Sequence, residues 1–207
     1  MARFVSTTFG TISGRHGSAV ATTTKNGQSI LRVFNAPSNP KTEAQMTQRT
    51  KFALVNKELS YMNDLFKISF HSNSGKNKAV SLALRNAVTG TYPNFSIDYS
   101  NLTIASGKLQ ITDQLSINTT TGTSVKVDWD STIGTESTSD DVVNLVFLNT
   151  LSKVVLLKQA TAVRSEGTVD VELPSAWAGA SIHSWIYFSN TDTSATSNSQ
   201  YLSLLQL

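Results

Sequence analysis

The sequence lacks cysteine and has little charge, little proline and no long apolar run. Its 207 residues include no Cys and 4 Pro, and charged residues make up 15%. Without cysteine, neither a disulfide framework nor a thiolate metal site can form. No apolar run approaches the roughly 20 residues that span a bilayer, and the first residues lack the apolar core of a secretory signal. We therefore expect no membrane span and a protein that is made in a cytoplasm and at first stays there.

The sequence is rich in serine and threonine, although it has few charged residues. Together they supply roughly a quarter of the chain, well above ordinary usage,. Low charge combined with many Thr, Val and Ile favours strands, turns and a surface that becomes covered. A chain of this length buries a core without covalent staples, as one large β domain or as two small ones.

The formal net charge of +3 conceals an uneven distribution. Up to Ser60 the chain has eight basic and two acidic residues, whereas after Ser100 it has five basic and ten acidic residues. A basic front could contact nucleic acid, or the two ends of the chain could attract each other in a head-to-tail or domain-to-domain contact. The basic residues occur singly and are not interleaved with aromatic residues, which makes nucleic acid the less favoured partner.

One helical pattern is much longer than any other. Pro40 suits the first turn of a helix, and Thr42 followed by Gln45 forms a capping-box pattern,. The period of the apolar residues that follow predicts one amphipathic helix with Phe52, Val55 and Leu59 in the core. Further apolar residues continue this stripe at steps of three and four, namely Met62 and Phe66. A second, shorter helix is predicted over residues 76–88.

Strand patterns flank the helices on both sides. Asn26-Gly27 between two extended segments predicts a hairpin in the amino-terminal part,. Beyond Tyr92-Pro93, seven or so short strands with regular turn signals predict an immunoglobulin-like sandwich. The sequence thus predicts a mostly β fold with two helices. Residues 1–94 form an α+β part with strands and both helices, and residues 97–207 form an Ig- or fibronectin-III-like β-sandwich.

No set of residues matches a known catalytic constellation. The glycines Gly10, Gly14 and Gly17 lack the buried strand and the helix that a phosphate-binding loop requires, so we interpret them as turn residues,. His16, His71 and His183 have no second histidine or carboxylate at ligand spacing. We interpret the first two as surface residues and His183 as lying on the outer face of a strand. We expect no enzyme and no cofactor.

Carboxylates gather between Asp128 and Asp141. Loop carboxylates can hold calcium, but this stretch lacks the glycine and the terminal glutamate of an EF-hand loop,. We interpret it as a solvated acidic loop and assign no metal site, although calcium stays open.

The strand pattern over residues 182–188 places three aromatic rings on one face. His183, Trp185 and Tyr187 alternate with Ile182, Ile186 and Phe188. Exposed aromatic rings stack on sugars or enter protein interfaces. The alternative is that both faces of the strand are covered within the fold, by the long helix. The sequence leaves the three interpretations open. The candidate interface residues are Arg15, Lys25, Arg49, Trp185 and Tyr187.

Several motifs resemble those of one uncharacterised family. They are the glycine-rich opening, Asn39-Pro40-x-Thr42-x-x-Gln45, the stretch from Leu102 to Leu109, and the closing Ser199-Gln200-Tyr201-Leu202. The family comprises proteins of about this length from Bacteroidota and the phages that infect them. The resemblance spans nearly the whole chain and implies the same layout, but it carries no activity and no site residues.

These observations lead us to expect a non-enzymatic structural protein that works by assembly, in the form of a bacteriophage virion component such as a capsid-vertex, spike or tail protein. Its partners would be other copies of itself or other virion proteins, and it would be assembled in the host bacterial cytoplasm. The alternative is a carbohydrate-binding or adhesion module, in the bacterial cytoplasm or at the cell surface, that binds glycans through Trp185 and Tyr187.

Overall fold

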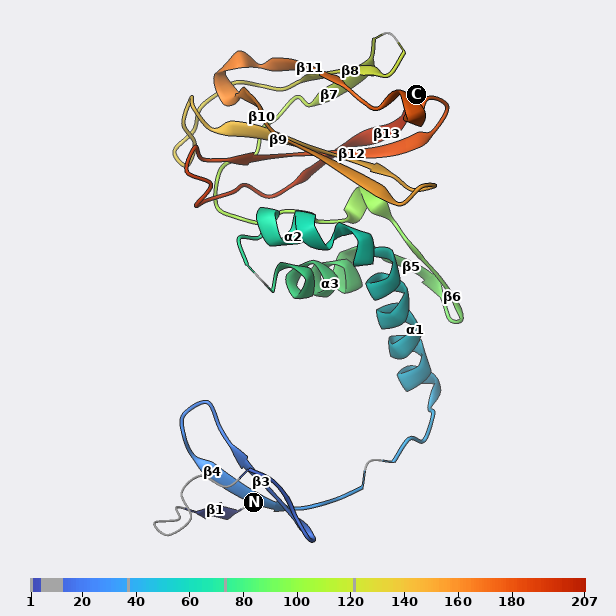
Figure 1. The fold of residues 1–207 in the computed structure, drawn as a ribbon, viewed down its shortest axis with the longest axis vertical. Coiled ribbons are helices and arrows are strands. Elements are labelled where there is room, and N and C mark those ends of the chain that lie inside the picture. The colour runs from blue at the N-terminus through green and yellow to red at the C-terminus, as the bar shows by residue number, and fades with distance from the viewer. Residues whose placement is uncertain (1, 5–12, 37, 73, 121) are drawn as a thin grey trace. The chain divides into compact units, whose positions relative to one another are not determined.

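A computed structural model describes residues 2–4, 13–36, 38–72, 74–120 and 122–207 (Figure 1). The chain divides into two compact units, Met1–Thr42 and Glu43–Leu207. The boundary that the sequence predicts between residues 94 and 97 falls inside the second unit. Independent folding of residues 97–207 therefore stays a prediction.

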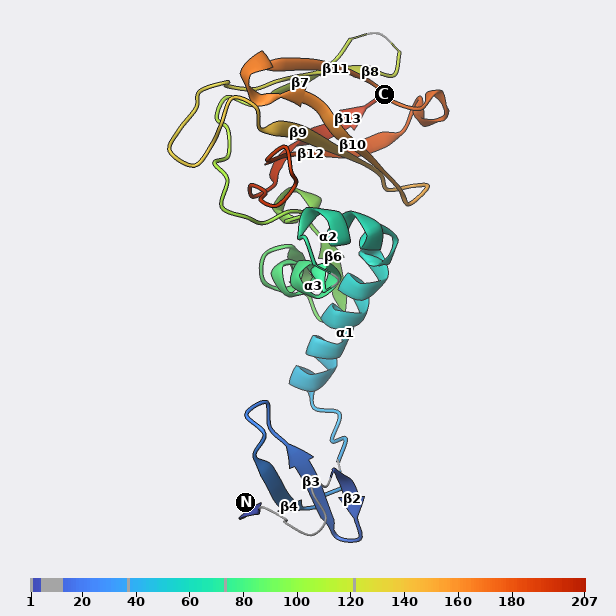
Figure 2. The same ribbon diagram turned by 60° about the vertical axis from the view of Figure 1, so that its left-hand side comes forward.

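The first unit is an antiparallel four-stranded sheet with the order β1-β4-β3-β2 (Figure 2). Its strands are β1 (Ala2–Phe4), β2 (Gly14–His16), β3 (Ala19–Thr23) and β4 (Ser29–Val33). The predicted hairpin is confirmed, because β3 and β4 pair across the Asn26-Gly27 turn. Gly27 has a φ of 75°, which glycine adopts at no steric cost,.

The second unit begins with a helical layer. It consists of α1 (Glu43–Glu58), the 3₁₀ turn η1 (Ser60–Met62), α2 (Asn63–Ser69) and α3 (Gly75–Asn86). The long predicted helix is thus interrupted at Leu59–Met62. Its apolar stripe nevertheless stays buried, including Val55, Leu59 and Phe66. The second predicted helix corresponds to α3, which buries Ala79, Val80 and Ala83.

The prediction that Phe52 lies in the core is wrong. Its side chain is 55% exposed. The amino-terminal half of α1 extends beyond α3 (Figure 1). Val55 is the only residue of this helix that is buried. The stripe therefore begins one turn later than its period indicates.

A β-sandwich follows the helices, as predicted. The hairpin of β5 (Val88–Thr91) and β6 (Asn94–Ile97) leads through the 3₁₀ turn η2 (Tyr99–Asn101) into two sheets with the orders β11-β8-β7 and β10-β9-β12-β13. We letter β7 to β13 in chain order as A, B, C, C′, E, F and G. The two sheets then have the orders E-B-A and C′-C-F-G, the arrangement of a fibronectin type III sandwich,. The strands are β7 (Ser116–Thr119), β8 (Ser124–Asp128), β9 (Val142–Asn149), β10 (Val154–Val163), β11 (Thr168–Glu172), β12 (Ser181–Ser189) and β13 (Gln200–Gln206).

The four-stranded sheet of the sandwich is covered on both faces. One core lies between the two sheets and includes Ile182, Ile186 and Phe188. The other lies between this sheet and the helices, and it includes Trp185 and Tyr187. The second unit is therefore built of three layers, in the order helices, four-stranded sheet, three-stranded sheet (Figure 1).

Candidate functional site

The amino-terminal sheet has one apolar face. Ala19 pairs with Val33 and Ala21 pairs with Leu31, so these four side chains share a face,. Val33 is 73% exposed, and Ala21 is the only buried residue between residues 13 and 36. A small sheet needs a packed apolar face for independent stability. Residues 13–36 of this unit do not provide one, which makes their apolar face a candidate interaction surface.

The opposite face of the same sheet is basic. Val20 pairs with Arg15 on β2 and with Arg32 on β4, so the three residues form a row across the sheet. The Arg15 guanidinium lies 3.9 Å from the centre of the Phe34 ring, and its Nε donates to the Gly17 carbonyl at 3.0 Å. Stacking of this kind leaves guanidinium N–H groups free to bind a carboxylate or phosphate.

A shallow pocket of about 180 Å³ lies beside this row. Its lining residues are Val20, Arg32, Val33, Phe34 and Asn35. The first 42 residues contain no acidic residue, so no carboxylate of this unit can neutralise the two arginines. The face therefore combines positive charge with an apolar floor.

The predicted basic interface residues are divided between the two units. Arg15 lies on β2 and Lys25 lies in the β3–β4 turn, whereas Arg49 lies on α1 in the second unit; all three are exposed. Arg32 was not among the predicted site residues. The alternation of Ile30 and Arg32 along β4, continued by Phe34 just after the strand, is the sequence signal that places Arg32 on the basic face,.

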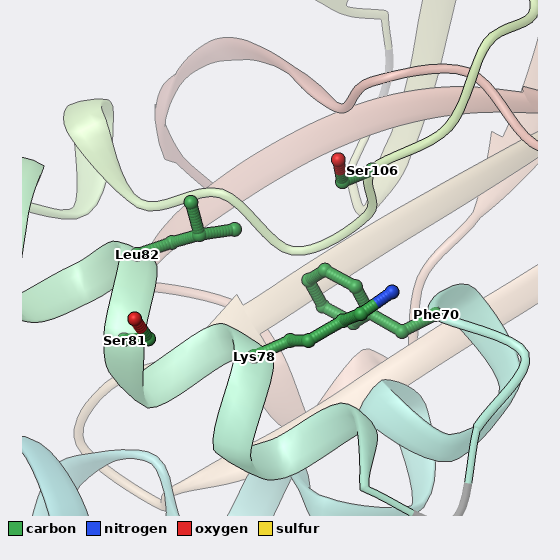
Figure 3. Close-up of a pocket in the computed structure, with 5 residues that line it drawn as sticks. All are labelled: Phe70, Lys78, Ser81, Leu82 and Ser106. Atoms are coloured by element: carbon green, nitrogen blue, oxygen red, sulfur yellow. The ribbon is translucent and has the colours of Figure 1, made fainter.

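A second pocket lies in the helical layer (Figure 3). It measures about 240 Å³ and is lined by Phe70, Lys78, Ser81, Leu82 and Ser106. Lys78, Ser81 and Leu82 are spaced along α3 so that they lie on one side of the helix. The lining offers one amine, two hydroxyls and apolar surface, with no carboxylate or imidazole. It suits a small amphipathic group, and it lacks a pair of groups for general acid–base chemistry.

Trp185 and Tyr187 are not surface residues. Their exposures are 0% and 2%, because the helical layer covers this face of β12. Of the interpretations that the sequence left open, cover within the fold is the one that the structure shows. The two residues stabilise the helix–sheet core and are not available to a sugar or a partner.

A chain of polar aromatic contacts joins the helical layer to the sheet. His183 lies half-buried in it, 4.5 Å from the Tyr99 ring centre, with its Nδ1 2.8 Å from the Tyr201 hydroxyl. This position corrects the expectation that His183 lies on an outer face. The Tyr99 hydroxyl lies 3.3 Å from that of Tyr61. Burial is the main cause that lowers the pKa of His183 and raises the pKa of Tyr61 and Tyr99.

The same chain of contacts ends at an ion pair. Glu58, the last residue of α1, accepts from the Tyr99 hydroxyl at 3.5 Å and lies 3.4 Å from the Lys153 ammonium. Its members come from α1, η1, η2, the β9–β10 turn, β12 and β13. We interpret this network as a set of contacts that holds the helical layer against the sheet.

The acidic stretch does not converge on one point. Asp128 accepts from Thr168 at 2.6 Å and Asp130 from Thr132 at 2.7 Å, and these hydrogen bonds lower the pKa of both carboxyls. Asp141 is buried against Arg164. Within the residues that the structure describes, no group of three or more His, Cys, Asp or Glu side chains could hold a metal ion.

The outer face of the β11-β8-β7 sheet carries most of its charge as carboxylates. Asp170 and Glu172 alternate along β11 and are exposed. On β8, Lys126 pairs in register with Asp170, and its ammonium lies 3.7 Å from Asp128. These residues thus give this face one positive and three negative charges.

Comparison with known protein families gives a match over nearly the whole chain. The model of a family of unknown function (DUF6266) matches residues 11–203. Among curated proteins, no sequence matches this chain. Within the described part of the chain, no helix is both long enough and apolar enough to cross a bilayer.

Proposed function

The chain belongs to a family of unknown function (DUF6266), and we propose that it is a non-enzymatic structural protein that works by assembly. In its most specific form, the proposal is a bacteriophage virion component, such as a capsid-vertex, spike or tail protein. Its partners are then other copies of itself or other virion proteins, and it assembles in the host bacterial cytoplasm. The specific setting rests on the resemblance to proteins from Bacteroidota and their phages.

One observation carries the proposal: residues 13–36, which form β2 to β4 of the amino-terminal sheet, have no core of their own. Among these residues only Ala21 is buried, while Leu31 and Val33 of the same face are exposed. Folded segments of about 40 residues or fewer need disulfides, metals or oligomerisation. This chain has no cysteine, which excludes the first. Burial against a partner supplies what the sheet lacks.

The first half of α1 supports the same proposal. From Glu43 to Leu54 no residue is buried, and Phe52 presents a large apolar surface to solvent. Helices without tertiary packing are marginal in water. The apolar face of β3 and β4 and the first half of α1 thus both present apolar side chains that the described residues leave uncovered.

The make-up of the pockets favours a non-enzymatic role. Among the described residues that line the pocket of Figure 3, only Lys78 has a side chain that titrates in the usual pH range. A pocket of about 410 Å³ at one end of the sandwich includes Lys108, Glu136 and Asp141. The Asp141 carboxylate is already held by Arg164, so it is not free to act as a base.

The glycan-binding alternative has lost the residues on which it rested. Trp185 and Tyr187 lie in the core, and no other observation favours a sugar site. Glycan binding is therefore one possible outcome of the experiment below and not a second proposal.

Sedimentation velocity of the full-length protein over a range of concentrations tests the proposal. We expect multimers, and we expect Leu31→Asp combined with Val33→Asp to make them smaller by placing charge on the apolar face. The matched control is Leu151→Asp with Val154→Asp, two exposed apolar residues of the β9–β10 turn and β10, which should leave assembly intact. A protein that stays monomeric alone and binds an immobilised glycan would instead favour the adhesion function.

A further inference from the structure

We propose that the basic face of the amino-terminal sheet docks on the outer face of the β11-β8-β7 sheet of a second copy, with Arg15 and Arg32 opposite Asp170 and Glu172. This inference rests on the proposed assembly function and names the contact that would produce it. It concerns the basic face, which is distinct from the apolar face of Leu31 and Val33.

The basic side of the contact is fixed by strand register. Arg15, Val20 and Arg32 lie in one row across β2, β3 and β4. Neighbouring strands are about 4.8 Å apart, so the backbones of the two arginines are separated by about 10 Å. Neither arginine forms an ion pair within the described residues.

The acidic side presents a matching pair of charges. Asp170 and Glu172 lie on the same face of β11 and about 7 Å apart along the strand, a distance that long arginine side chains can span,. Neither carboxylate belongs to an ion pair of the described residues, because Lys126 approaches Asp128 instead. β11 is also an edge strand of its sheet, which leaves it accessible.

Charge complementarity selects a second copy as the occupant. The first unit, residues 1–42, contains 5 basic and no acidic residues, a net charge of +5, whereas residues 95–207, which include the sandwich, contain 5 basic and 11 acidic residues, a net charge of −6. Like charges oppose contact between two amino-terminal sheets through their basic faces. Each copy, however, carries both partners of the proposed contact. Nucleic acid is less favoured, because the pocket beside Arg32 has an apolar floor of Val20 and Phe34 rather than further cations.

The proposed contact joins the basic face of one copy to a different surface, the acidic face, of the next copy. It is therefore heterologous and can repeat from copy to copy. Heterologous contacts produce rings when the rotation closes and filaments when it does not. Both outcomes suit a protein that forms repeated structures.

Charge reversal in full-length protein tests the contact. We expect Arg15→Glu with Arg32→Glu to reduce the multimers seen in sedimentation velocity at about 0.1 M salt to the smaller ones that the apolar face alone holds, and Asp170→Lys with Glu172→Lys to do the same. When the two variants are mixed, the wild-type multimers should return, and the chain with all four reversals should form them by itself. The matched control, Lys76→Glu with Arg85→Glu, changes the charge equally on α3 and should assemble as wild type does. Because Arg15 also stacks on Phe34, circular dichroism and Arg32→Glu alone show whether a loss reflects unfolding.

Three results would overturn the inference. Wild-type assembly that neither reversal weakens would reject this contact while leaving the proposed assembly function in place. Wild-type protein that is monomeric at every salt concentration would reject both. Binding of duplex DNA that the arginine reversals abolish, without self-association, would assign the basic face to nucleic acid.

Discussion

Asp141 and Arg164 form an ion pair that is completely enclosed in the sandwich. The Arg164 Nε lies 3.2 Å from the Asp141 Oδ2, and the side chains are 0% and 1% exposed. The guanidinium lies 3.9 Å from the Phe188 ring centre, and its Nη2 donates to the Gln110 carbonyl at 2.7 Å. The pair therefore connects the loop before β9, the turn after β10 and the segment around Gln110.

Removing one member of this pair should destabilise the protein strongly. Asp141→Ala leaves a buried guanidinium without its carboxylate, and we expect a loss of about 3–5 kcal/mol in the free energy of unfolding. The control is Asp64→Ala, which breaks the exposed pair with Lys67 and should cost at most about 1 kcal/mol,. Urea unfolding followed by circular dichroism measures both. Equal losses would show that the buried pair contributes no more than a surface one.

A second prediction concerns the buried apolar stripe of α1 and α2. Leu59→Ala removes a fully buried side chain and should cost about 2–5 kcal/mol,. Phe52→Ala, at an exposed position, should change the free energy of unfolding by roughly half a kcal/mol or less. Thermal and urea unfolding of dilute protein are the measurements. A large loss for Phe52→Ala in the monomer would mean that the first half of α1 is packed after all.

His183 should make stability depend on pH. Burial lowers its pKa in the folded protein, despite the opposing attraction of Asp98, so the unfolded chain binds the proton more readily. The stabilising contribution is then present above the unfolded pKa of about 6.5 and is lost as the pH falls below it. We expect the melting temperature of the wild type to fall more between pH 7 and pH 5 than that of His183→Gln. Parallel curves for the two proteins would refute this role, in which Tyr99 and Tyr201 are the nearest partners.

Truncation tests how the second unit depends on its helices. Residues 43–207 contain both cores, and we expect this fragment to unfold cooperatively. Residues 97–207, which the sequence predicts to be a domain, would expose Trp185 and Tyr187 once the helices are removed. We expect that fragment to be less stable and to bind a dye that reports exposed apolar surface. Equal stability of the two fragments would support the boundary that the sequence predicts.

The sequence by itself determined the elements that local physics controls. Asn26-Gly27 predicted its hairpin because few other dipeptides adopt the required turn. Alternation along residues 182–188 assigned the two faces of β12, and the spacing of Val55, Leu59 and Phe66 identified the buried side of the helices. The seven-strand sandwich followed from regular strand and turn signals.

Only the tertiary structure decided what those faces meet. The spacing of apolar residues that placed Phe52 in the core does not record how far α3 extends along α1. It therefore could not distinguish the exposed Phe52 from the buried Val55. The alternation that grouped Trp185 with Tyr187 is the same whether a helix or solvent lies above them. Asp141 with Arg164, and Arg15 with Arg32, are brought together by strand pairing and chain reversal across many residues. Such contacts depend on the packing of distant segments, which no local pattern of the sequence records.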